Sequence, residues 1–93
     1  HRSFKWCTVT AYYAMFHASK ALVLKKGYRE KSHGCLLIAL RKLYPEHPFL
    51  AEDFELCLHL RHEADYSCSY DADSARIAVE KAESFIVKAS NLL

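Results

Sequence analysis

The sequence predicts an all-α protein folded as one antiparallel, up-and-down bundle of about four helices. Its 93 residues include only two glycines and two prolines, too few for the many turns of a strand-rich fold. Apolar residues recur at spacings of three and four, as on the buried face of a helix. The chain is 52% hydrophobic and 13% aromatic, which is enough for a core and excludes a disordered chain. We expect one domain over residues 1–93, because no linker, repeat or low-complexity tract interrupts the pattern.

The first helix is expected from about Phe4 to Lys26. Its apolar residues surround nearly the whole cylinder, which is typical of a central helix packed by several neighbours. Gly27 supplies a residue suited to the left-handed conformation that ends many helices. Lys25 and Lys26 suit the negative end of the helix dipole, so the helix is predicted to stop here.

The second helix is expected from residue 32 or 33 to Tyr44. Ser32 is a suitable N-cap, because its hydroxyl can accept a hydrogen bond from a backbone N–H of the first turn. Pro45 and Pro48 are expected to end the helix, since neither fits a helix interior.

The third helix is expected from about Leu50 to residue 66 or 67, and the fourth from a cap at Asp71 to Leu93. Arg61 lies on the apolar stripe of the third helix, one turn before Asp65. Apolar residues recur along the whole fourth helix, so that helix needs a partner surface.

Composition narrows the class of protein only partly. The formal net charge of +2 neither requires nor forbids nucleic acid. No apolar run is long enough to cross a bilayer, and no secretory signal is present. The scattered Cys7, Cys35, Cys57 and Cys68 predict reduced thiols that pack as small hydrophobic residues in a soluble, cytoplasmic protein. Cys57 and His59 point in different directions on a helix, so we expect no metal site, and nothing indicates a cofactor.

Three stretches of the chain together resemble the HEPN family. The first is Ala-Tyr-Tyr-Ala-Met-Phe-His-Ala at residues 11–18, and the second is Lys-Ser-His-Gly at residues 31–34. The third, Arg-His-Glu-Ala-Asp-Tyr at residues 61–66, is similar to the Arg-x-x-Ala-Asp-Tyr signature of one HEPN branch. Their order and spacing match the family over about residues 2–93.

The resemblance implies a helical bundle that usually carries a further helix before the Tyr-Tyr segment. That helix is not in this sequence, so we expect an apolar part of the first helix to be exposed. A large exposed apolar patch usually marks an interaction site. The expected result is a homodimer or a larger self-assembly.

Many HEPN proteins are ribonucleases whose motif is an Arg, then four to six residues, then a His on the corresponding helix. No His follows Arg61 at that spacing, which argues against this route of catalysis. Arg41 and His47 match the spacing formally, but the match spans Pro45 and is interpreted as chance, because the helical context is missing.

The candidate binding residues are Arg61, Asp65, Tyr66, Tyr13 and His17. Arg61 and Asp65 lie four residues apart and can pair on one helix face. A guanidinium held by a carboxylate can present its N–H fork to phosphate. An equally good interpretation is an ion pair that fixes helix packing, with Tyr66 hydrogen-bonded nearby.

Tyr13 and His17 are expected to line the same site if it forms a polar cleft. Only one of the adjacent Tyr12 and Tyr13 is expected to face it, while the other packs in the core. For His17 and for His33, at the start of the second helix, a hydrogen-bonded structural role is favoured over catalysis.

Basic residues also gather around the first two helices: Lys25, Lys26, Arg29, Lys31, Arg41 and Lys42. An ordinary solvated surface is the favoured interpretation of such a cluster. The alternative is a contact area for the phosphates of RNA.

The leading hypothesis is a module that binds nucleotide or RNA phosphates around Arg61. The resemblance implies that it acts with a minimal nucleotidyltransferase partner in a toxin–antitoxin-like or stress-response setting, with Tyr66 as the residue such a partner could modify. The alternatives are a metal-independent endoribonuclease and a purely structural self-assembly module.

Overall fold

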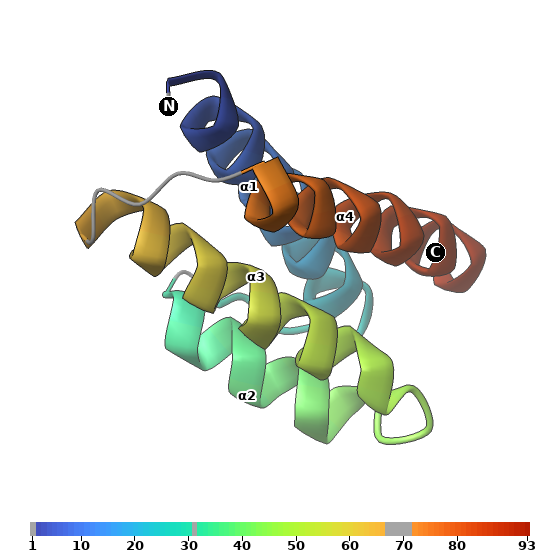
Figure 1. The fold of residues 1–93 in the computed structure, drawn as a ribbon. Coiled ribbons are helices and arrows are strands. Elements are labelled where there is room, and N and C mark those ends of the chain that lie inside the picture. The colour runs from blue at the N-terminus through green and yellow to red at the C-terminus, as the bar shows by residue number, and fades with distance from the viewer. Residues whose placement is uncertain (1, 31, 67–71) are drawn as a thin grey trace.

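The computed structural model describes residues 2–30, 32–66 and 72–93, and it places the side chains of residues 5–30, 32–63 and 72–93. Four helices form over these residues: α1 (Arg2–Lys25), α2 (His33–Leu43), α3 (Pro48–Tyr66) and α4 (Ala72–Leu92). The described ranges contain no strand. Figure 1 shows the four helices packed together as one body. The all-α prediction with four helices is therefore confirmed.

Helix α1 is the central element of the fold. It contacts each of the other three helices, whereas α2 and α4 do not touch each other within the described ranges. Its inward positions Tyr12, Met15, Leu22 and Val23 are fully buried. A helix with neighbours on several sides needs apolar residues around most of its cylinder, as its sequence predicted.

The helix directions alternate from α2 to α4 but not from α1 to α2. The middle of α1 meets the start of α2 through Tyr12 and His33. The ends of the same helices meet where the Tyr44 hydroxyl donates to the Leu22 carbonyl at 2.7 Å. Helices α1 and α2 therefore run in roughly the same direction.

Helix α3 then runs against its neighbours. Near its start Asp53 faces Lys81 of α4 at 3.7 Å, and further along Cys57 faces the Ala78 carbonyl. The seven-residue link between α1 and α2 can reach about 23 Å when extended, longer than the roughly 16 Å length of α2. This length lets the chain return along α1 before α2 begins. The predicted up-and-down arrangement of neighbouring helices is therefore wrong for α1 and α2.

Two predicted capping residues, Gly27 and Ser32, are confirmed, whereas the predicted role of one proline is wrong. Gly27 has a φ of 91°, and the Ser32 hydroxyl accepts a hydrogen bond from the Cys35 N–H at 3.1 Å. Pro48 begins α3 instead of only ending α2. The first turn of a helix tolerates proline because its N–H groups have no intrahelical acceptor. The predicted cap Asp71 lies outside the described residues.

An apolar hollow lies between the first half of α1 and α4. It has a volume of about 430 Å³ and is lined by Trp6, Cys7, Thr10, Ala11, Ala14, Val79, Ala82, Glu83 and Ile86. Trp6 is 66% exposed. The expectation of an exposed apolar part of the first helix is confirmed.

No helix among the described residues has both the length and the apolar character to span a bilayer.

Candidate functional site

Arg61 of α3 lies over two tyrosine rings of α1. Its guanidinium carbon is 5.2 Å from the ring centre of Tyr12 and 5.0 Å from that of Tyr13. A cation over the face of an aromatic ring is attracted by the negative charge of that face. The two rings therefore fix the guanidinium on the α1 side of α3.

The buried tyrosine of this pair also holds a histidine. The Tyr12 hydroxyl is hydrogen-bonded to Nδ1 of His33, and the His33 ring lies 4.9 Å from that of Phe16. Phe54 of α3 closes the cluster with its ring 5.6 Å from Tyr12. The Arg61 site, defined here as Tyr12, Tyr13, Phe16, His33 and Arg61, thus combines side chains from α1, α2 and α3.

The protonation states follow from burial and from the nearby cation. Burial raises the pKa of Tyr12 to about 12, and Arg61 opposes that rise. Burial also lowers the pKa of His33, and the charges of Arg61 and His62 lower it further. At neutral pH the tyrosine keeps its proton and the imidazole stays neutral. We therefore assign Tyr12 as the donor and Nδ1 of His33 as the acceptor, which leaves the imidazole proton on Nε2.

The local sequence explains how these side chains meet. Tyr12, Tyr13 and Phe16 fall on neighbouring positions of α1, because residues three and four apart share a helix face. His33 is the first residue of α2, whose start is fixed by the Ser32 cap. Since α2 runs parallel to α1, that first turn lies beside the middle of α1.

The structure brings together some of the predicted site residues. Arg61 and Tyr13 are in contact. His17 is exposed, and its ring lies 5.6 Å from that of Phe16, at the margin of the Arg61 site. The side chains of Asp65 and Tyr66 lie outside the described residues, so the Arg61–Asp65 pair stays a prediction.

Two features of the site differ from the sequence analysis or were absent from it. The prediction that one of Tyr12 and Tyr13 packs in the core is confirmed, because Tyr12 is fully buried and Tyr13 is 40% exposed, but Arg61 contacts both rings. The partner of His33 was missed, since Tyr12 lies 21 residues away in the chain. The expected hydrogen-bonded role of His33 is nevertheless confirmed.

The arrangement suits recognition of an oxyanion. The N–H groups of a guanidinium point outward in its own plane and match the oxygens of phosphate or carboxylate. Tyr13 is 40% exposed, so it also offers an aromatic surface beside the cation. Neutral His33 adds an Nε2–H to the site, which is a hydrogen-bond donor.

The basic cluster predicted around the first two helices separates into paired and unpaired cations. Lys25 donates to the carbonyls of Leu92 and Leu93. Arg41 pairs with Glu55 at 3.0 Å. These two residues therefore bind other parts of the fold.

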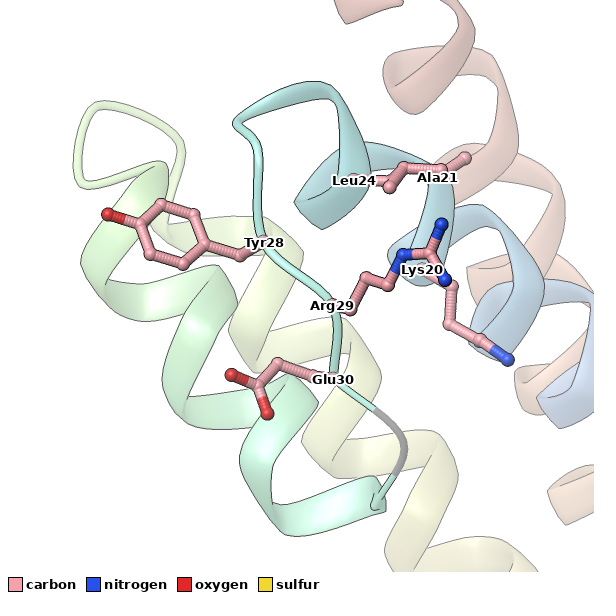
Figure 2. Close-up of a pocket in the computed structure, with 6 residues that line it drawn as sticks. All are labelled: Lys20, Ala21, Leu24, Tyr28, Arg29 and Glu30. Carbon is pink, nitrogen blue, oxygen red and sulfur yellow. The ribbon is translucent and has the colours of Figure 1, made fainter.

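Arg29 instead borders a cleft of about 290 Å³ between the second half of α1 and the following link (Figure 2). Its lining is Lys20, Ala21, Leu24, Tyr28, Arg29 and Glu30. Lys20 was not among the basic residues that the sequence singled out. The predicted Lys31 lies outside the described residues.

The described cysteines differ in burial, whereas the sequence analysis expected all of them to pack as small hydrophobic residues. Cys57 is fully buried, and burial raises its thiol pKa to about 12. It packs as a small hydrophobic residue, as expected. Cys7 and Cys35 are exposed, so the prediction is wrong for these two. Cys68 lies outside the described residues.

Comparison with known proteins assigns the family. The chain matches the HEPN domain over residues 1–92. It belongs to the HEPN family. It is also similar to a UPF0332 protein of Archaeoglobus fulgidus, with 34% identity over 90 residues. That alignment covers 91% of this chain and 72% of the archaeal protein. No solved structure matches the chain significantly.

Proposed function

We propose that this HEPN protein binds the phosphates of a nucleotide or of RNA through Arg61. The observation that carries the proposal is the seating of Arg61 on Tyr12 and Tyr13, beside neutral His33. A half-buried guanidinium held by two rings has lost much of its freedom before a ligand arrives. Less entropy is then lost on binding, which favours affinity.

Tyr13 adds a reason to favour a nucleic acid over a simple anion. Every base has a flat π-face, and stacking on an aromatic side chain contributes about 1–3 kcal/mol per base. Its partly exposed ring lies against the same guanidinium that would hold a phosphate. A base and its phosphate could therefore contact neighbouring residues of one site.

The proposed partner is a minimal nucleotidyltransferase, in a toxin–antitoxin-like or stress-response setting. This part rests on the family, in which such pairs recur, and on the position of Tyr66 in the last turn of α3. Co-expression with a nucleotidyltransferase encoded beside this chain tests it. The proposal expects a stable complex and a mass increase on Tyr66; recovery of two separate, unmodified proteins contradicts it.

A second candidate function is a metal-independent endoribonuclease. The observation that favours it is the position of His33, which comes from α2 and lies in the Arg61 site. No His follows Arg61 on α3 at the spacing of the family's ribonuclease motif. In this reaction the Tyr12–His33 hydrogen bond opens, and the freed Nδ1 takes the proton of a 2′-hydroxyl as that oxygen attacks phosphorus. The bond to the 5′-oxygen then breaks, and protonated His33 returns the proton to that leaving oxygen, which leaves a 2′,3′-cyclic phosphate and a 5′-hydroxyl.

This second candidate has its own test. Cleavage of an end-labelled RNA in the presence of a chelator should be lost in both Arg61→Ala and His33→Ala. RNA that stays intact with the wild-type protein, with and without magnesium, excludes the nuclease and leaves the binding proposal standing.

We also propose self-association through the apolar hollow of α1 and α4. Trp6 is largely exposed there, and Val79 and Ile86 are each more than a third exposed. Burying such a patch is favourable by about 25 cal/mol per Å² of apolar surface. A purely structural assembly module would use this surface alone and would bind no nucleotide.

Fluorescence anisotropy of a labelled ten-residue oligouridine tests the binding proposal. Arg61→Gln keeps a polar side chain but shortens it and removes the charge. We expect at least a tenfold weaker affinity, because a charge-assisted hydrogen bond contributes about 1.5–3 kcal/mol.

Arg76→Gln is the matched control. Arg76 is exposed on α4 and bonds Glu80 at 3.3 Å, and it is not one of the residues that form the Arg61 site. The control should bind like the wild type. Equal affinities of all three proteins overturn Arg61 as the binding residue.

A further inference from the structure

The cleft beside α1 contains two neighbouring cations. Lys20 comes from α1 and Arg29 from the link that follows it. Figure 2 shows Lys20 and Arg29 on the same side of the link, while Tyr28 and Glu30 extend on its other side. Ala21 and Leu24 give the cleft an apolar wall.

Unlike three other basic residues, Lys20 and Arg29 have no acidic partner among the described residues. Arg41, Arg76 and Lys81 each lie within 4.0 Å of a carboxylate oxygen. Within the described ranges, no carboxylate oxygen lies that close to Lys20 or Arg29. Two like charges in one hollow repel each other, and an anion placed between them relieves that repulsion.

A row of aromatic rings connects this cleft with Arg61. The Lys20 ammonium lies 5.4 Å from the ring centre of Phe16. The Phe16 ring in turn lies 6.2 Å from the Tyr13 ring, on which Arg61 rests. From Tyr13 to Lys20 the helix rises about 10 Å. Cations therefore lie at both ends of a short aromatic row on α1.

We propose that the Lys20–Arg29 cleft is a second phosphate-binding position, so that one single-stranded oligonucleotide bridges it and Arg61. This inference rests on the proposed function. It narrows the ligand to a strand with at least two phosphates, because a mononucleotide cannot occupy both ends of the row. The cleft volume of about 290 Å³ lies at the low end for ligand pockets and suits a phosphate with its sugar.

The strand would follow α1. Alternation of cations and aromatic rings along a groove is how sequence-independent single-strand binders hold their ligand. One phosphate lies at Arg61, the chain passes over the exposed edge of Tyr13, and a later phosphate lies between Lys20 and Arg29. Glu30 also lines the cleft, but its side chain extends from the other side of the link than that of Arg29.

The test compares uridine monophosphate with the ten-residue oligouridine on the intact protein. The variant Lys20→Ala/Arg29→Ala should bind the oligonucleotide at least tenfold more weakly and the mononucleotide as well as the wild type does. Each lost phosphate contact should also reduce the slope of log affinity against log salt by about 0.7. Because the double variant loses one phosphate position, we expect its slope to be lower by about 0.7.

Lys88→Ala/Arg76→Ala is the matched control. Lys88 also lies over a phenylalanine ring, 4.2 Å from the centre of Phe49, and Arg76 is likewise exposed. All the substituted residues are exposed, and thermal unfolding checks that both double variants stay folded.

The outcomes separate this inference from the proposed function. Unchanged oligonucleotide affinity in Lys20→Ala/Arg29→Ala, with a defect in Arg61→Gln, overturns the cleft and leaves Arg61 in place. A defect in the cleft variant with none in Arg61→Gln overturns the proposed function. Equal losses for both ligands in the cleft variant overturn the bridging strand, and no binding by the wild type overturns both proposals.

Discussion

Helix α1 presents two surfaces of opposite character. Toward α2 and α3 it carries Tyr12 and Tyr13, which are joined to Arg61 and His33 by a hydrogen bond and by ring contacts. Toward the middle of α4 it carries Trp6 and the apolar hollow, whose lining includes a single charged residue, Glu83. Directional contacts select a ligand of particular shape and charge, whereas apolar area gives association with little selectivity.

The comparison explains why one helix can serve two roles. The middle of α1 is held from several sides, so its side chains keep a fixed geometry suited to binding. Its first half has only α4 beside it over the hollow, so its apolar residues remain available. Four substitutions test this division, from the largest effect on stability to the smallest.

Tyr12→Ala should lower the free energy of unfolding by about 4 kcal/mol, as for removal of a large aromatic residue from a core. Tyr12 is fully buried and bonds His33. Urea unfolding followed by circular dichroism measures the change. Tyr13→Ala, at a partly exposed ring, is the comparison and should cost less than half as much; equal costs contradict the division between a buried and a partly exposed tyrosine.

Tyr12→Phe removes only the hydroxyl and should cost about 1–2 kcal/mol, because Nδ1 of His33 is left without its donor. The same urea measurement applies. Little change in Tyr12→Phe, or a change of the same size in Tyr13→Phe, counts against a structural Tyr12–His33 hydrogen bond.

The pH dependence of stability should follow His33. Its pKa is lowered in the folded protein, so the unfolded chain binds the proton more readily. The contribution of neutral His33 is therefore present above its unfolded pKa of about 6.5, and it is lost as pH falls through the folded pKa. The melting temperature should drop between pH 7.5 and pH 5, and less steeply in His33→Gln.

His17→Gln is the control for this titration, because His17 is exposed and takes no part in the Tyr12–His33 hydrogen bond. Its pH profile should match that of the wild type. If the melting temperature of His33→Gln falls with pH as steeply as that of the wild type, the pH dependence arises from other groups and the assignment to His33 is wrong.

Trp6→Ala should change the free energy of unfolding by no more than about 0.5 kcal/mol, as is usual for exposed positions. It should nevertheless weaken self-association, because Trp6 is 66% exposed on the hollow. Sedimentation velocity at several concentrations measures this. Val87→Ala, at another exposed apolar residue of α4 that does not line the hollow, should leave association unchanged. A wild type that remains monomeric removes the hollow as an interface.

The sequence predicted the helices better than their directions. Periodicity, Gly27 and the Ser32 cap act within a few residues, so these elements could be identified from the chain alone. The parallel course of α1 and α2 depends on how a seven-residue link folds back. That course depends on distant contacts such as Tyr44 with Leu22, which no local pattern encodes.

The site was predictable to a similar degree. Arg61 and Tyr13 were identified from their motifs, and the structure places them in contact. The Tyr12–His33 hydrogen bond and the cleft at Lys20 join residues from different segments. These residues come together only because α2 and the link pack against α1, so the sequence alone did not predict that they are neighbours.

The central claim is that Arg61 contacts the phosphate of a bound nucleic acid. Nuclear magnetic resonance of the Arg61 side-chain Nε–H, identified by its loss in Arg61→Gln, tests this during titration with oligouridine. The account predicts a saturable shift of that resonance together with the His33 ring, and no shift of the Arg76 Nε–H. Saturable binding that leaves the Arg61 resonance in place would contradict it.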